Sequence, residues 1–171
     1  MVRNFAYCVF LLLSLILSAC QRSAEEVPLN SSLFSLTDKF FDVQAISENK
    51  AIVVGYGGKI LVTLDGGRTW KSKQSGTDVA LYSLAFPDPR NGWISGQDGA
   101  LLHTTDGGST WNRQESGMVD SIFGITFVDT NHGWAVGDRA TFLKTLDGGE
   151  NWELGYIQPS LEGVGADATL S

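Results

Sequence analysis

The stretch TTDGGSTW, residues Thr104–Trp111, decides the fold because the chain carries it three times at a constant spacing. The other two copies are TLDGGRTW at Thr63–Trp70 and TLDGGENW at Thr145–Trp152. Their aspartates, Asp65, Asp106 and Asp147, lie 41 residues apart in both intervals. A fixed period of this length indicates a repeat architecture, in which each period is one structural unit that packs on its neighbours.

Each 41-residue unit contains four short apolar or alternating runs separated by Gly, Asp or Asn. In the middle unit these runs are 81–86, 92–96, 101–103 and 110–114. They are rich in β-branched and aromatic residues, and no stretch shows helical spacing, so each run is predicted to be a strand. Four strands in a repeated unit of about 40 residues are typical of a β-propeller blade. We therefore expect an all-β chain with three blades, at about 40–80, 81–121 and 122–160.

The number of units raises the question of closure. Propellers have about four to eight blades, because a closed ring removes exposed strand edges. Residues 161–166 stand where a fourth unit would begin, but they lack its aromatic residue. Three interpretations remain: a shortened relative of a longer propeller, a chain that pairs with another copy to complete the ring, or a partial extra blade made from 33–37 and 161–170. Each predicts exposed edges in an isolated monomer.

The N-terminal segment has the features of a bacterial lipoprotein signal peptide. A basic start at Arg3 precedes an apolar run from Phe5 to Leu17, and the order Leu-Ser-Ala-Cys at 17–20 resembles a lipobox. This predicts a signal peptide at 1–19, lipidation of Cys20 and a polar tether at 20–32 ahead of the repeats at 33–171. Gln21 follows the cysteine, which resembles the pattern of proteins sent to the outer membrane. The expected location is the periplasmic side of the outer membrane, or the cell surface.

Charge and cysteine content exclude several classes of function. The chain has a formal charge of −7 and only two cysteines, Cys8 and Cys20. An acidic chain has no electrostatic footprint for nucleic acid or for anionic lipid headgroups. Removal of the signal peptide would leave no thiol other than the lipidated one, which excludes a disulfide framework, a zinc–thiolate site and a cysteine nucleophile. We expect no cofactor and no metal.

The repeated motif is interpreted as a structural turn. Aspartate accepts hydrogen bonds from backbone N–H groups close behind it, glycine adopts positive φ at no steric cost, and tryptophan anchors the turn by burial. One identical residue in each unit is what a fold requires, whereas a catalytic site needs different residues in different roles. Calcium needs six to eight oxygens at one place, which these turns do not supply. The structural set is Asp65, Gly67, Trp70, Asp106, Gly108, Trp111, Asp147, Gly149 and Trp152.

The candidate binding face lies opposite the repeated turns. It consists of the loops between the second and third strands and the turns between blades, which differ from unit to unit, and a binding face can use such variation. The alternative is that they are only solvated loops. His103 and His132 are isolated in different structural positions, which favours a strand-edge or loop role over a metal site, because a metal needs more ligands. The candidate residues are Tyr56, Asp78, Gln97, Asp98, Asp120, Asp138 and Arg139.

The motif closely resembles the Asp-box, or bacterial neuraminidase repeat. The fuller unit includes Asp88, Asn91-Gly92-Trp93, Gly96, Gly99 and Leu101 before the box, and it resembles the photosystem II stability/assembly factor family and its relatives in non-photosynthetic bacteria. The resemblance covers about 40–157. It implies a seven-bladed propeller that acts as an assembly chaperone for membrane protein subunits, without catalysis. This chain departs from that pattern by having about three blades.

The sequence leaves one favoured hypothesis and two alternatives. Sialidases also carry the Asp-box, but they need an arginine cluster, a Tyr/Glu nucleophile pair and an acid/base aspartate, and no converging arginine triad is visible in the sequence. The favoured hypothesis is a non-catalytic, lipid-anchored binding or scaffold propeller that assists membrane protein assembly through a protein partner. The alternatives are a sialidase-like glycan-handling protein and a fragment of a longer propeller.

Overall fold

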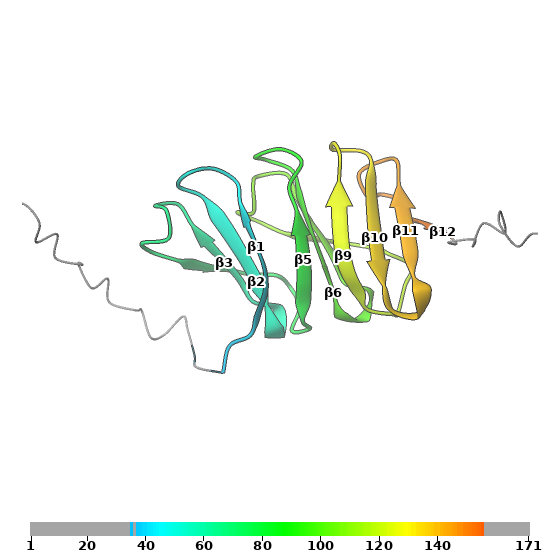
Figure 1. Cartoon of the computed structure of the whole chain (residues 1–171), viewed down its shortest axis with the longest axis horizontal. Coiled ribbons are helices and arrows are strands. Elements are labelled where there is room, and N and C mark those ends of the chain that lie inside the picture. The colour runs from blue at the N-terminus through cyan, green and yellow to red at the C-terminus, as the bar shows by residue number, and fades with distance from the viewer. Residues whose placement is uncertain (1–34, 36, 156–171) are drawn as a thin grey trace, which may run out of the picture. The chain divides into compact units, whose positions relative to one another are not determined.

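The computed structural model describes residue 35 and residues 37–155 as an all-β fold of three four-stranded antiparallel sheets (Figure 1). Blade 1 consists of β1 (Phe40–Ala45), β2 (Ala51–Gly55), β3 (Ile60–Thr63) and β4 (Lys71–Lys73). Blade 2 consists of β5 (Leu81–Ala85), β6 (Gly92–Gly96), β7 (Leu101–Thr104) and β8 (Asn112–Gln114). Blade 3 consists of β9 (Ile122–Phe127), β10 (Gly133–Gly137), β11 (Phe142–Thr145) and β12 (Glu153–Gly155).

This architecture confirms the predicted all-β, propeller-type fold with four-stranded blades. The described part of the chain holds three blades, fewer than a closed ring contains. Three short 3-10 turns, η1 (Tyr56–Gly58), η2 (Gln97–Gly99) and η3 (Asp138–Ala140), connect the second and third strands of the blades. The predicted signal peptide, Cys20, the tether and the segment 161–170 lie outside the described residues. Within them, no helix is long and apolar enough to cross a membrane.

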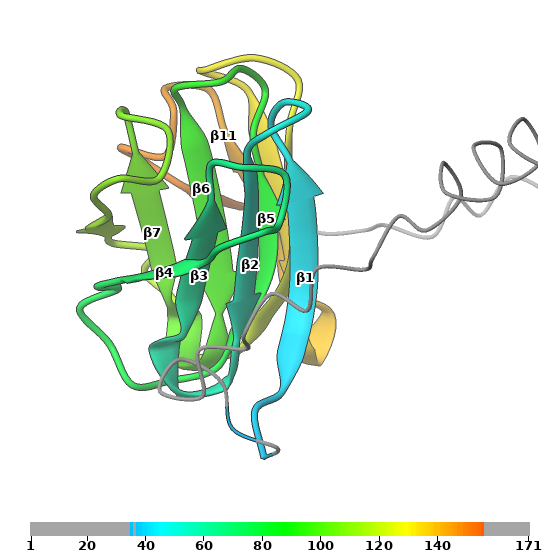
Figure 2. The same cartoon turned by 90° about the vertical axis from the view of Figure 1, so that its left-hand side faces the viewer.

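Strands follow their sequence order across each sheet, so the first strand of every blade is an edge strand. Figure 2 looks onto blade 1, where β1, β2, β3 and β4 follow one another from one edge to the other. The first strands of the three blades, β1, β5 and β9, are spatial neighbours. We call them the inner strands.

The strand register repeats with the sequence period. Val43 pairs with Val53 in blade 1, and the equivalent pairs are Leu84 with Ile94 and Ile125 with Ala135. Each inner strand also has a register shift near its start, where one extra residue forms a bulge. A bulge changes the direction in which a side chain points. The three bulges therefore place equivalent side chains at equivalent angles along the inner strands.

Two apolar cores lie between the blades. One contains Ile52 and Val62 of blade 1 together with Ile94 and Leu102 of blade 2, and the other joins blade 2 to blade 3. Side chains alternate across a strand, so Ile94 belongs to the first core while its neighbour Trp93 belongs to the second. Both faces of blade 2 are thus covered by apolar side chains of its neighbours.

Blades 1 and 3 each leave one face open in the described structure. Val43 is 63% exposed, whereas its equivalent in blade 2, Leu84, is 6% exposed. On the other side, Val136 of blade 3 is 48% exposed, whereas its equivalent Ser95 is fully buried. The compared residues occupy the same place in their own blades. The differences in exposure therefore come from whether a neighbouring blade covers that face.

Trp93 is the largest side chain of the second core. Its ring stacks on Phe127 at 3.7 Å and on His103 at 4.4 Å between centroids. Its indole N–H donates to the carbonyl of Gly148 at 3.0 Å, which ties blade 2 to the repeated turn of blade 3. The equivalent residue, Trp134, is partly exposed on the open face of blade 3.

We expect Trp93→Ala to lower the free energy of unfolding by about 3–5 kcal/mol, the range for truncating a large buried aromatic side chain. Trp134→Ala is the matched control and should cost less than half as much, because its ring packs on one side only. Urea denaturation followed by circular dichroism measures both. Equal losses for the two variants would contradict the assignment of the core.

Candidate functional site

The repeated turn is held by a closed set of hydrogen bonds around its aspartate. In blade 2, the Thr104 hydroxyl donates to Asp106 Oδ1 at 2.8 Å and accepts from Gly108 N–H at 2.9 Å. The Thr110 hydroxyl donates to Asp106 Oδ2 at 2.7 Å, and its backbone N–H donates to Oδ1 at 2.9 Å. Equivalent bonds surround Asp65 and Asp147. The carboxylate is therefore engaged within its own turn.

These donors stabilise the charged form of the aspartates. The hydroxyl of Thr69, followed by its backbone N–H, lowers the pKa of Asp65 to about 2. The same two groups of Thr110 hold the pKa of Asp106 far below its usual range, and the Asn151 side chain lowers the pKa of Asp147. An ordinary aspartate titrates near pH 4 (about 3.9) in the unfolded chain. A general acid would need its pKa raised instead.

The turns contribute stability that depends on pH. A folded-state pKa below the unfolded value means that the unfolded state binds more protons, so this stability is present above about pH 4 and is lost as pH falls through about 2. We expect the midpoint of thermal unfolding to fall steeply from pH 4 to pH 2. Asp106→Asn should lower this midpoint at pH 7 and should make it depend less on pH. An unchanged slope in Asp106→Asn would contradict this prediction.

The repeated turn also connects neighbouring blades. The carbonyl of Gly148 in blade 3 accepts from Trp93 and, at 3.1 Å, from the Gln114 side chain, both in blade 2. Trp111 of the blade 2 turn lies in the core shared with blade 1, edge-on to Phe86 at 5.9 Å between centroids. The tryptophan of the turn thus reaches beyond its own blade.

The candidate residues of the opposite face do lie at one end of the blades. The η turns contact the turns between blades: Gly58 N–H donates to the Val79 carbonyl at 2.7 Å, and the Ser116 hydroxyl donates to the Gly99 carbonyl at 2.8 Å. Arg139 in η3 lies 3.4 Å from Asp120. Tyr56, Asp78, Asp98, Asp138 and Arg139 are exposed, and Gln97 and Asp120 are partly buried. We call this surface the loop end; no ligand contact tests its role, so that role stays a prediction.

The loop end depends on glycine where a turn meets the next connection. Gly99 has φ +67°, and a Cβ there would lie 2.0 Å from the Met118 carbonyl oxygen. Gly57 has nearly the same φ, +68°, but a Cβ there would meet nothing within 4 Å. A Cβ at Gly57 would therefore cause backbone strain alone, whereas a Cβ at Gly99 would cause the same strain and a steric collision.

We expect Gly57→Ala to lower the free energy of unfolding by about 1–2 kcal/mol, the cost of a left-handed conformation for a residue with a Cβ. Gly99→Ala should cost clearly more, because the Cβ also displaces the connection to blade 3. Urea denaturation of the two variants provides the comparison, and equal costs would show that the connection moves aside freely.

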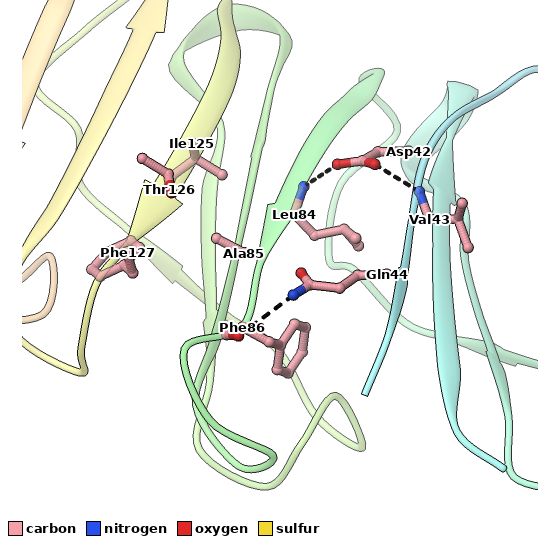
Figure 3. A pocket seen from close by; sticks show the side chains of 9 residues that line it. All are labelled: Asp42, Val43, Gln44, Leu84, Ala85, Phe86, Ile125, Thr126 and Phe127. Atoms are coloured by element: carbon pink, nitrogen blue, oxygen red, sulfur yellow. Dashed lines mark hydrogen bonds between the residues drawn. The ribbon is translucent and has the colours of Figure 1, made fainter. Parts of the chain in front are cut away.

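Sequence reasoning missed the surface formed by the inner strands. A hollow of about 240 Å³ lies in front of β5, between β1 and β9 (Figure 3). The lining residues are Asp42, Val43, Gln44, Leu84, Ala85, Phe86, Ile125, Thr126 and Phe127. We call this hollow the inner groove.

A row of aromatic side chains runs across the bulges of the inner strands. Phe41 and Tyr82 meet edge-on at 5.3 Å, and Tyr82 and Phe123 lie 5.5 Å apart between centroids. Phe41 and Phe123 are exposed. The three residues are 41 positions apart in sequence, which is the signal that could have revealed the row.

Asp42 links two inner strands through their backbone. Its Oδ1 accepts from Val43 N–H at 2.8 Å, and its Oδ2 accepts from Leu84 N–H at 2.9 Å and from the Ser83 hydroxyl at 3.2 Å. Two residues on, the Gln44 amide donates to the Phe86 carbonyl at 3.4 Å. Figure 3 shows both side chains reaching from β1 to β5. They occupy an exposed strand edge that would otherwise lack partners.

The histidines do not come together. His103 stacks on Trp93, and burial lowers its pKa. The His132 ring nitrogen Nδ1 lies 2.8 Å from Asp129 Oδ2 in an exposed loop. Among the described residues, no group of three His, Cys, Asp or Glu side chains is placed to hold a metal ion.

Comparison with known proteins identifies relatives of this fold. The family model of the photosynthesis system II assembly factor YCF48 matches residues 22–119 and 113–162. A solved structure described as YCF48 bound to D1 peptide is 27% identical, with a TM-score of 0.62 over 69% of this chain and 39% of the other. YCF48 from Cyanidioschyzon merolae is 24% identical, with a TM-score of 0.60 over 68% of this chain and 39% of the other. No curated protein matches.

Proposed function

We propose that this chain, which belongs to the family of the photosynthesis system II assembly factor YCF48, is a non-catalytic binding propeller. In this proposal it holds a peptide segment of a membrane protein during assembly. The observation that carries the proposal is the similarity to a YCF48 structure bound to a D1 peptide. The chain spans about two fifths of the length of that structure, 39%. Because this chain is shorter than that relative, the peptide binding of the longer protein is a proposal for this chain.

The surfaces of the described blades support a binding role. The inner groove is lined by polar side chains of β1 and β9, and the same strands carry exposed aromatic rings, a combination that suits an extended peptide. By contrast, the carboxylates of the repeated turns accept hydrogen bonds from groups of the same turns, and these bonds keep their pKa low. We infer that the working surface lies away from the repeated turns.

A glycan-handling function receives less support. Sialic acid recognition by the Asp-box enzymes requires arginines that converge on one carboxylate. Arg68 belongs to the repeated turn of blade 1, whereas Arg139 belongs to η3 of blade 3 and faces Asp120 at the loop end. These two arginines lie on opposite ends of different blades, so they do not share a ligand.

The proposed setting is a lipid anchor at Cys20 that keeps the blades close to membrane proteins. The order Leu-Ser-Ala-Cys at 17–20 after an apolar run supports it. We further propose that the open faces of blades 1 and 3 meet in a second copy, because each presents apolar side chains where blade 2 is covered. The mass of the delipidated protein in solution tests this last point, and a stable monomer would contradict it.

Photo-crosslinking in intact membranes tests the proposed function. We expect a crosslinkable amino acid at Phe123, beside the inner groove, to capture an extramembrane segment of a membrane protein. The matched control carries the same amino acid at Thr105, in an exposed part of the repeated turn. Mass spectrometry identifies the captured chain. Failure to capture a membrane protein from Phe123, and from a third position at Asp98 on the loop end, would overturn the proposal.

A further inference from the structure

The three inner strands have equivalent backbone amides, but only two of them are occupied by a side chain. Val43, Leu84 and Ile125 hold the same register position in β1, β5 and β9. Asp42 accepts from the N–H groups of Val43 and Leu84, which shows that these amides point away from the second strand of their own blades. By the same register, Ile125 N–H points toward the inner groove.

The residues that could cap Ile125 differ from their equivalents in blade 1. The position of Asp42 is taken by Ser83 in β5 and by Gly124 in β9. Ser83 donates to Asp42, so its hydroxyl faces the opposite junction, and glycine has no side chain. Likewise, Ala85 replaces Gln44 and supplies no amide to the Phe127 carbonyl. Within the described residues, no side chain hydrogen-bonds to the backbone of Ile125 or Phe127.

A second group in the inner groove also lacks a partner. The Oε1 atom of Gln44 is buried and accepts no hydrogen bond within the described part of the chain, while its Nε2 donates to Phe86. A buried acceptor without a donor is unfavourable. The groove therefore offers a backbone donor at Ile125, whereas the unpartnered Gln44 Oε1 beside it is closed to solvent.

We propose that the inner groove binds an extended peptide through a side-chain carboxamide, Asn or Gln, whose oxygen accepts from Ile125 N–H. This rests on the proposed peptide-binding function and names its site and the chemistry it selects. The oxygen of a carboxamide is an uncharged acceptor for a backbone N–H group. A carboxylate is disfavoured because Asp42 already places a negative charge in the groove, and like charges repel. The aromatic row takes the neighbouring apolar side chain of the peptide.

The molecule offers a matched pair of variants for the test. Asp42 caps the N–H of the residue that follows it, and Gly124 occupies the equivalent place before Ile125. Gly124→Asp should therefore cap Ile125 from within the chain, whereas Gly124→Ala adds a Cβ without an acceptor. The Cβ at position 124 meets Val136 Cγ2 at 3.2 Å in both variants, so the crowding is the same.

The probe is the capped peptide Ac-Ser-Phe-Asn-Val-Ser-amide, with Asp or Leu in place of Asn as comparisons. Titration of the isotope-labelled protein by NMR reports the backbone amide of Ile125. We expect the Asn peptide to shift this amide and to bind about fivefold tighter than the Leu peptide, the ratio for one hydrogen bond of about average strength. The Asp peptide should bind more weakly than the Asn peptide. Gly124→Ala should keep the binding and Gly124→Asp should lose it.

Equal binding to Gly124→Asp and Gly124→Ala would overturn the proposal, as would binding that leaves the Ile125 amide unshifted. Either result leaves the proposed function intact if crosslinking still captures a membrane protein. Should Gly124→Asp fail to fold, Thr126→Trp provides a second test, because Thr126 is exposed and lines the groove. It should block the Asn peptide, while Thr130→Trp, in an exposed loop, should not. Unchanged binding to Thr126→Trp also refutes the site.

Discussion

The structure depends on covering both apolar faces of a four-stranded blade. A single blade cannot do this alone, because its side chains alternate between two faces and both carry large apolar residues. Both faces of blade 2 are covered because it has one neighbour on each side: Ile94 packs on blade 1 and Trp93 packs on blade 3. The exposed Val43 and Val136 mark the faces on which this requirement is unmet in the described chain.

Hydrogen bonds give the stack its geometry, although burial supplies most of its driving force. The aspartate of each repeated turn orders the loop that carries a tryptophan, and the loop of blade 3 accepts the indole of Trp93 from blade 2. On the inner side, Asp42 joins β1 to β5 through backbone amides. The repeated turns and the inner strands therefore perform different tasks: the turns hold the blades in place, and the inner strands present polar groups in a groove.

Much of the fold could be predicted, because the period of 41 residues appears in the strands, the register and the turns alike. The site was less predictable. The residues of the loop end were found because they interrupt the repeat, and the structure does gather them at one end. The inner groove was missed because Asp42 and Gln44 look like ordinary polar residues in a strand. Their importance depends on the spacing between β1 and β5, which no local pattern encodes.

By itself the sequence determined the strand-rich repeat, the number of units and the turn chemistry, since each depends on residues close together in the chain. Only the tertiary structure decided which equivalent positions differ in environment. Trp93 is buried and Trp134 is partly exposed, although both occupy the same place in their blades. Similarly, Leu84 N–H has a side-chain acceptor from β1, whereas no side chain among the described residues hydrogen-bonds to the equivalent amide of Ile125. The physical reason is that burial and hydrogen bonding across a junction depend on the neighbouring blade.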